Sequence, residues 1–289
     1  MGLGVKFSTL AEVVTSISAC PQFFLEETPP RIPGILEDGK ILNQSRYKPI
    51  CQTYNSERRF VTLYDISNKI PVFSAYNGGN INMVPFDDNI YMNQAGNNDY
   101  KKQSDFDRGH IFPNSHAFTV EDKNSTFTLT NVVPQAKRFN QQSWNKMESC
   151  VKCVLQKYCI NNNARHEGFV VTGAQPSTNN FLNNKINIPS MLWSAFCCYS
   201  SSLNRWIASA HWGDNVPDEH TKKYLTTRTL EELHQTLIYF CVDECPLLKE
   251  YSFFFFFFGK IPFSCLLQTE TRCWTPFSPL YVQWFTSYG

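Results

Sequence analysis

The sequence predicts an α+β protein, because strand-like runs lie on both sides of one long helical stretch. The helical stretch is 137–158, in which apolar residues recur at intervals of three and four residues. The strand-like runs are rich in β-branched and aromatic residues, and they span 59–64, 70–76, 168–173, 188–198 and 206–210.

The chain before the first strand-like run, 20–50, is predicted to be rich in loops because it contains several prolines that break regular structure. The runs 59–64 and 70–76 then form an expected hairpin, joined by the polar residues 67–69. A long polar run follows at 77–105 and is predicted to be a loop that leads into a turn at 107–110.

The run 127–133 is predicted to be a strand that precedes the long helix, since polar and β-branched residues alternate along it. On the helix, Asn140 falls on the apolar stripe and Glu148 at its edge, counting about 100° per residue. Polar groups that face a core need partners, and a metal ion with its waters would be one. A second, amphipathic helix is predicted at 229–239.

The net charge of the 289 residues is only +1, which argues against a protein that holds nucleic acid statically over a broad basic face. Any basic contact surface is therefore expected to be local. The candidates are Arg108 with Lys137 and Arg138, and an upstream arginine that the sequence does not single out from Arg46, Arg58 and Arg59.

The segment Asp107-Arg108-Gly109-His110 is followed by Asn131-Val132-Val133-Pro134-Gln135, then by Asn140 and Glu148. This set, in this order and spacing, resembles the DNA/RNA non-specific endonuclease family. The hairpin run with Thr62-Leu63-Tyr64-Asp65 resembles the same family. The resemblance implies a ββα-metal (His-Me finger) nuclease fold with a central, mostly antiparallel sheet flanked by helices. It covers about 20–245.

The chemistry of phosphodiester hydrolysis suggests roles for two of these residues. A histidine, with an ordinary pKa of about 6.5, suits a general base near neutral pH, and we assign that role to His110. The planar guanidinium of Arg108 matches two phosphate oxygens and would hold the scissile phosphate. Gly109 would allow a tight backbone next to substrate, and Asp107 would fix its neighbours by accepting hydrogen bonds.

The resemblance implies that Asn140 binds Mg²⁺, for which Mn²⁺ can substitute, while water completes the coordination. Mg²⁺ often takes only one or two protein ligands, so a single amide oxygen is sufficient. Glu148 would accept hydrogen bonds from the metal-bound waters, and Asn131 would fix the geometry of the site. Lys137 and Arg138 would contact the substrate. The predicted activity is sequence-nonspecific cleavage of DNA and RNA.

Ordinary structural roles compete with these assignments. Asn140 could cap a helix and Glu148 could be a solvated helix residue. The remaining histidines are expected to be structural or to lie on the surface (His116, His166, His211, His220 and His234). The CxxC at 150–153 could bind zinc, although no second CxxC completes such a site and disulfides are an alternative. A further alternative is an inactive nucleic-acid-binding or structural module on the same fold.

Eleven cysteines favour an oxidising compartment, and we expect the protein to be secreted. The resemblance implies a disulfide between Cys20 and Cys51. Residues 1–19 form a poor signal peptide and are expected to be a leader or a disordered N-terminus. Residues 246–289 contain a run of phenylalanines, are too interrupted to span a membrane and are expected to lie outside the domain.

Overall fold

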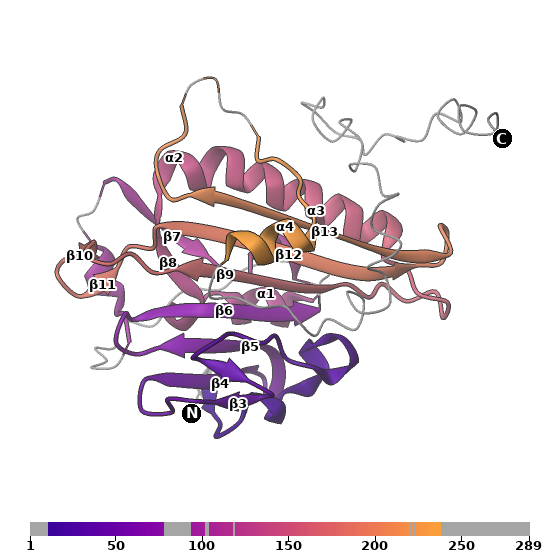
Figure 1. Cartoon of the computed structure of the whole chain (residues 1–289), viewed down its shortest axis with the longest axis horizontal. Helices are drawn as coiled ribbons and strands as arrows, with labels where there is room; N and C mark the ends of the chain where they lie inside the picture. Colours follow the sequence, from indigo (N-terminus) through magenta and orange to yellow (C-terminus); the bar gives the residue numbers. More distant parts are fainter. Residues whose placement is uncertain are drawn as a thin grey trace, which may run out of the picture.

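The computed structural model describes residues 11–77, 94–101, 104–117, 119–219, 221 and 224–237. Its centre is a seven-stranded sheet in which every neighbouring pair of strands is antiparallel (Figure 1). In spatial order the strands are β1 (Ala11–Val13), β4 (Tyr47–Tyr54), β5 (Glu57–Asp65), β6 (Ile70–Asn77), β9 (Phe169–Gln175), β12 (Met191–Ser200) and β13 (Arg205–Asp214). The predicted α+β class with a mostly antiparallel sheet is confirmed.

The other strands in the described part of the chain form three short antiparallel pairs, called hairpins below. The longest helical stretch is continuous from α2 to α3. The hairpins are β2 (Leu36–Glu37) with β3 (Lys40–Ile41), β7 (Phe106–His110) with β8 (Val132–Ala136), and β10 (Phe181–Leu182) with β11 (Ile186–Asn187). The helices are α1 (Val120–Thr126), α2 (Lys137–Phe139), the π-helix η7 (Asn140–Trp144), α3 (Asn145–Tyr158) and α4 (Leu230–Thr236). Short 3₁₀ turns are η1 (Ile17–Ala19), η2 (Pro21–Phe23), η3 (Leu25–Glu27), η4 (Asn97–Tyr100), η5 (Asn114–His116) and η6 (Leu129–Asn131).

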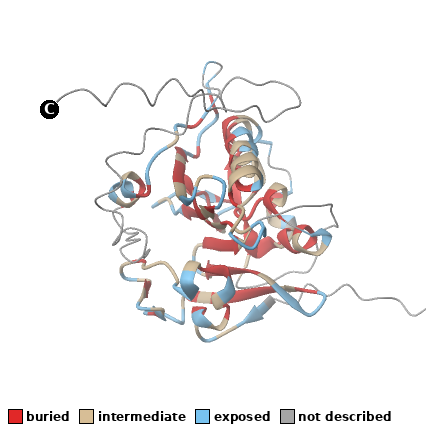
Figure 2. Ribbon diagram, turned by 90° about the vertical axis from the view of Figure 1, so that its right-hand side faces the viewer, coloured by how far each residue is buried: buried red, intermediate tan, exposed pale blue. Residues whose placement is uncertain are grey.

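The sheet is buried on both faces, because a separate apolar cluster covers each one. On β12, Leu192 and Phe196 point into the cluster beneath α3, whereas Trp193 points into the cluster that contains residues of α4. This is the alternation expected of a strand with two covered faces. Figure 2 shows the buried residues gathered in the strands and on the helix faces that pack against them.

Several predicted elements are confirmed and others are wrong. The predicted hairpin is β5–β6, and the three later strand-like runs are β9, β12 and β13. The predicted strand 127–133 is wrong, because Leu129–Asn131 forms a 3₁₀ turn and the strand begins at Val132. The predicted turn at 107–110 lies in β7, paired with β8. Most of the predicted loop 77–105 lies outside the described residues.

The loop-rich prediction for 20–50 missed the start of β4, in which Pro49 lies between β1 and β5. The carbonyl of Pro49 accepts a hydrogen bond from Val14 N–H at 3.0 Å, and Pro49 is in register with Leu63. A proline removes only one donor from the ladder, so the remaining residues of this strand still pair with both neighbours.

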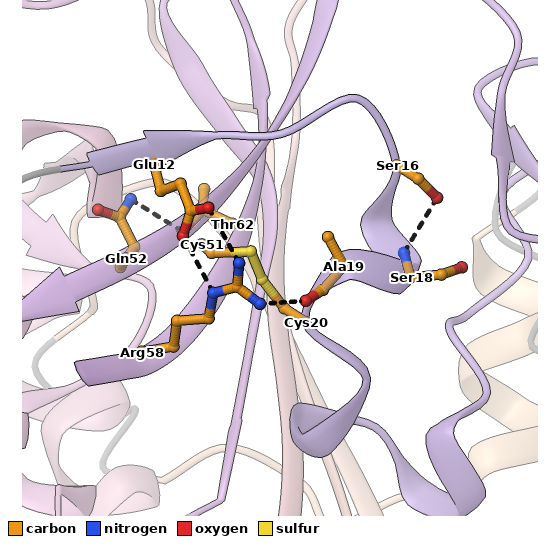
Figure 3. Close-up of a disulfide and its surroundings, with 9 residues drawn as sticks. All are labelled: Glu12, Ser16, Ser18, Ala19, Cys20, Cys51, Gln52, Arg58 and Thr62. Atoms are coloured by element: carbon orange, nitrogen blue, oxygen red, sulfur yellow. Dashed lines mark hydrogen bonds and ion pairs between the residues drawn. A yellow bond between two sulfur atoms is a disulfide. The ribbon is translucent and has the colours of Figure 1, made fainter. Parts of the chain in front are cut away.

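Residues 11–19 belong to the folded unit, although the sequence suggested a leader or disorder up to residue 19. β1 pairs with β4, and Ile17 is completely buried. Figure 3 shows the Arg58 guanidinium donating to both carboxylate oxygens of Glu12 and to the Ala19 carbonyl, beside the disulfide between Cys20 and Cys51. The predicted tail, 246–289, lies outside the described residues. No helix in the described part of the chain is long and apolar enough to cross a membrane.

Candidate active site

The β7–β8 hairpin and the helix that follows it form a ββα unit. His110 is in register with Val132, and Asp107 with Gln135. The helix starts directly after β8, and Lys137 N–H donates to the Asp105 carbonyl at 2.9 Å. The three segments that carry the candidate residues are therefore joined by backbone hydrogen bonds, which fixes the hairpin against the start of the helix.

Gly109 is required by the packing of this hairpin. A Cβ at this position would lie 2.6 Å from Cβ of Gln135 and still closer to its amide oxygen. The Gln135 side chain is completely buried and fills the space above Gly109. The sequence suggested that glycine allows close approach to substrate, whereas the structure shows that it makes room for the neighbouring strand's side chain.

Asp107 links the hairpin to the helix, as expected of a residue that accepts hydrogen bonds from its neighbours. Its Oδ2 accepts from Asn140 Nδ2 and from Gln141 Nε2, each at 2.9 Å. Because the amide nitrogen of Asn140 faces the carboxylate, its amide oxygen is directed the other way. Among the described residues, no group donates a hydrogen bond to that oxygen, so it remains available to a ligand.

His110 is half-buried, and its ring packs edge-on against Phe127 with the centroids 4.8 Å apart. Burial, with a smaller contribution from the positive charge of Arg108, lowers the pKa of His110 to about 4. Its Nε2 is buried and has no hydrogen-bond partner among the described residues. The imidazole is therefore neutral at neutral pH and retains a lone pair that can accept a proton.

Asn131 is completely buried and uses its whole amide to hold the backbone near His110. Its Oδ1 accepts from Phe112 N–H at 2.9 Å and from the Ser74 hydroxyl at 3.0 Å. Its Nδ2 donates to the carbonyls of Phe112 and Thr126, each at 3.0 Å. The Asn131 side chain thus takes the backbone hydrogen bonds that a neighbouring strand would otherwise supply. This explains why the predicted strand at this position is wrong.

Glu148 lies on α3, two turns beyond Asn140, and is half-buried. Burial raises the pKa of Glu148 to about 8, with a smaller opposing effect from the Trp144 indole. Its backbone carbonyl lies 2.7 Å from Nε2 of His116, and Nδ1 of His116 lies 3.0 Å from the Tyr76 hydroxyl. His116, which the sequence assigned only a structural or surface position, thus connects the sheet to the helix at Glu148.

The basic candidates differ in exposure. Lys137 is exposed at the start of the helix, and Arg108 and Arg138 are half-buried. The three upstream arginines are all engaged with carboxylates: Arg46 with Asp65, Arg58 with Glu12, and Arg59 with Glu57 and Asp122. Their carboxylate partners occupy the guanidinium groups that an upstream phosphate contact would need.

Two residues that sequence reasoning missed lie in the loop after β13. Asn215 Oδ1 accepts from Ala136 N–H at 2.7 Å, and Asn215 Nδ2 donates to the Pro134 carbonyl at 2.9 Å. Asp218 Oδ2 accepts from Ser143 N–H at 2.9 Å. Because these partners are about 75–80 positions away in the sequence, no local pattern could have indicated them.

Several of the described cysteines are in disulfides. Cys159, at the end of α3, is bonded to Cys198 of β12, and Cys153 is also in a disulfide. Cys153 is therefore not a thiolate that could complete a zinc site with Cys150. In the part of the chain that the structure describes, no cluster of three or more His, Cys, Asp or Glu side chains is arranged to hold a metal.

A hydrated Mg²⁺ does not need such a cluster, since it keeps most of its waters and can be held by one or two oxygen ligands. The oriented amide oxygen of Asn140 is a ligand of this kind. The carboxyl of Glu148, held largely protonated by burial, would ionise readily beside a cation. The residues present therefore fit a magnesium site with few protein ligands.

Known proteins share both the sequence pattern and the fold. The family described as DNA/RNA non-specific endonuclease matches residues 40–243. The human endonuclease domain-containing 1 protein is 27% identical over 218 residues, which cover 65% of this chain and 40% of that protein. The mouse protein of the same name is 27% identical over 208 residues, covering 62% and 38%. The chain thus spans about two fifths of these relatives' length.

A shorter match reaches the human mitochondrial endonuclease G, which is 35% identical over 74 residues, covering 25% of each chain. A crystal structure of an EndoG/EndoGI complex, described as showing the mechanism of EndoG inhibition, superposes with a TM-score of 0.51 at 19% identity. It covers 66% of this chain and 85% of the matched chain. At this identity the match supports the fold alone.

Proposed function

This chain belongs to the DNA/RNA non-specific endonuclease family, and from that membership we propose that it is a magnesium-dependent endonuclease that cleaves DNA and RNA without sequence preference. The observation that carries the proposal is the pair of hydrogen bonds at Asp107. They turn the Asn140 amide so that its oxygen is free for a cation. An asparagine that merely capped the helix would instead use this oxygen on backbone N–H groups.

Asn140 would hold the metal, and Glu148 would accept hydrogen bonds from its waters. Mg²⁺ bound there would polarise the scissile phosphate and stabilise the charge that develops on the leaving oxygen. His110, neutral because burial lowers its pKa, takes the proton of the attacking water on a ring nitrogen. Arg108 binds two oxygens of the phosphate through its guanidinium fork.

The remaining contacts would carry no sequence information. Lys137 and Arg138 stand at the start of the helix and would bind the sugar-phosphate backbone on either side of the cleaved bond. Contacts to phosphate position a nucleic acid but do not read its bases. A site of this composition should therefore cut DNA and RNA alike.

The proposal is tested by nicking of supercoiled plasmid and cleavage of a structureless RNA, with Mg²⁺ and with EDTA. The test compares the wild type with Asn140→Ala and with Asn145→Ala, which removes an exposed amide from the same helix. We expect cleavage by the wild type and the Asn145 variant, loss with EDTA, and loss in the Asn140 variant. A folded wild type that cuts neither substrate would favour the inactive module.

The His110→Ala variant tests the assignment of the general base independently of the metal. It should abolish cleavage while leaving Mn²⁺ binding in place, because the imidazole acts on water and not on the metal. A His110 variant that cuts normally would refute the assignment of the general base.

We also propose that the protein acts in an oxidising compartment outside the cytosol. The disulfides Cys20–Cys51 and Cys159–Cys198 support this, since such bonds are rare where glutathione keeps thiols reduced. Immunoblots of culture medium and cell lysate under non-reducing conditions should show the oxidised protein in the medium. Accumulation of a reduced form in the cytosol would refute it.

A further inference from the structure

The continuous helix from α2 to α3 contains one wide turn between Asn140 and Glu148, the two residues that are proposed to serve the metal. Residues Asn140–Trp144 form a π-helix, and Asn145 N–H donates to the Asn140 carbonyl five residues earlier. In an uninterrupted α-helix, residues eight positions apart such as Asn140 and Glu148 would point about 80° apart. A wide turn takes up one extra residue without advancing the helix, so the same pair points within about 20° of one direction.

A carboxylate from outside the helix holds this wide turn. An uninterrupted α-helix would direct Ser143 N–H to the carbonyl of Phe139. In the structure, Ser143 N–H donates to Asp218 Oδ2 at 2.9 Å. Ser143 is completely buried and Asp218 is 2% exposed, so water does not compete for this bond. A hydrogen bond from an amide to a buried carboxylate is among the stronger ones in a protein.

The loop that carries Asp218 is itself fixed to the ββα unit. Asn215 binds both Ala136 N–H and the Pro134 carbonyl at the end of β8, and it also donates to the Pro189 carbonyl at 3.0 Å. A Cβ added to Gly213 would lie 3.0 Å from the ring of Phe139, which shows how closely β13 approaches the helix start. In Figure 1 the end of β13 lies beside α2.

The part of the helix beyond the wide turn cannot rotate to compensate. Met147, Val151 and Leu155 of α3 are buried in the main apolar cluster, and Cys159 ties the end of α3 to β12. If the wide turn relaxed to an α-helix, α3 would stay in place. The residues before the turn would rotate by about 100°, and Asn140 would leave Asp107.

We propose that Asp218 is a positioning residue of the metal site, which keeps the π turn open and thereby brings Asn140 and Glu148 to one face of the helix. The inference rests on the proposed function, because it assumes that these two residues serve a cation. It assigns a role in the active centre to a loop whose Asp218 lies 75 residues after Ser143 in the sequence.

The first experiment measures Mn²⁺ affinity of the full chain from the EPR signal of the free ion. Asp218→Ala should weaken Mn²⁺ binding by about 10- to 100-fold, the range found when a group that orients a ligand is removed. Asp218→Asn, which keeps an oxygen acceptor for Ser143 N–H, should retain most of the affinity. Glu219→Ala is the matched control, since it removes the neighbouring exposed carboxylate and should leave Mn²⁺ binding unchanged.

A deletion separates the helix register from a general loss of stability. Removing Gln142 takes the extra residue out of the wide turn, so an ordinary α-helix would again place Asn140 and Glu148 on one face. The deletion combined with Asp218→Ala should therefore restore Mn²⁺ binding that Asp218→Ala alone has lost, even if the single variant folds poorly. A double variant that binds Mn²⁺ no better than Asp218→Ala would overturn the proposal, as would an Asp218→Ala protein with unchanged affinity.

A readout without metal distinguishes this inference from the proposed function. Exchange of the Ser143 amide hydrogen should accelerate at least tenfold in Asp218→Ala relative to the wild type, because the buried acceptor is gone. If the wild type bound no Mn²⁺, the proposed function would fail. The amide exchange of the two proteins would still decide whether Asp218 holds the turn, and equal exchange would refute that part.

Discussion

Acidification should destabilise this fold through buried histidines, and His211 on β13 offers the cleanest test. His211 is 7% exposed, its Nε2 lies 3.2 Å from the Thr227 hydroxyl, and burial lowers the pKa of His211 from 6.5 to about 4. The unfolded chain therefore binds a proton at a pH where the folded chain does not. The stabilising contribution of the neutral ring is present above pH 6.5 and is lost as the pH falls towards 4.

The magnitude follows from these two pKa values. Between about pH 7.5 and 4.5, a single group that shifts from 6.5 to about 4 removes about 2.5 kcal/mol from the free energy of unfolding. His211→Gln keeps a donor towards Thr227 but cannot take up the proton. The variant should therefore lose about 2.5 kcal/mol less than the wild type over this pH interval.

The assay is urea unfolding followed by tryptophan fluorescence at several pH values. The matched control is His166→Gln, which makes the same replacement at an exposed position and should follow the wild-type curve. Burial also lowers the pKa of His116 to about 4, so the wild type should lose stability steeply in acid. Glu148 acts in the opposite sense, because burial raises its pKa. Its contribution to the free energy of unfolding is present below pH 4.5 and is lost as the pH rises through about 8. Parallel curves for wild type and His211→Gln would refute the reasoning.

Three further outcomes are expected. Asp107→Ala should weaken Mn²⁺ binding by about 10- to 100-fold because Asn140, the proposed metal ligand, loses the acceptor that orients it, whereas Gln141→Ala, which removes the other donor to this carboxylate, should not; equal Mn²⁺ titrations of the wild type and Asp107→Ala would contradict this. Gly109→Ala should lower the free energy of unfolding by about 1–3 kcal/mol, and adding Gln135→Ala should recover only part of it, because it removes the clash with the amide group but leaves Cβ of residue 135 in place; a thermal melt measures both, and a neutral single variant would count against the packing argument. Cys159→Ser with Cys198→Ser should cost about 2–4 kcal/mol, because the bond closes a long loop, and reductant should lower the melting temperature of the wild type by more than that of this variant, which keeps the Cys20–Cys51 bond.

The sequence predicts those parts of the fold that depend on local patterns. The hairpin β5–β6 and the long helix follow from β-branched runs and helical spacing, and both are present. The hydrogen bond between Asp107 and Asn140 joins two parts of one recognised motif, so its residues could be named in advance. The motif could not reveal what the side chains face, such as the Gln135 side chain that fills the space where a Cβ at Gly109 would lie.

The errors share a physical cause, which is that side chains and distant segments override local preference. Asn131 bends its own segment into a 3₁₀ turn by bonding backbone groups of Phe112 and Thr126. Pro49 marks a break in the sequence, yet its strand is held from both sides by β1 and β5. The wide turn at Asn140–Trp144 has no signal of its own, since Ser143 is bonded by a carboxylate far along the chain.

The dependence of β8 on Asn215 also bears on the order in which the protein is made. Synthesis proceeds from the N-terminus, so a nascent chain contains His110, Asn140 and Glu148 well before Asn215 leaves the ribosome. Until then the ends of the hairpin lack the side chain that bonds Pro134 and Ala136. A chain that carries the proposed phosphodiester-cleaving groups therefore lacks a finished centre until the segment after β13 has been synthesised.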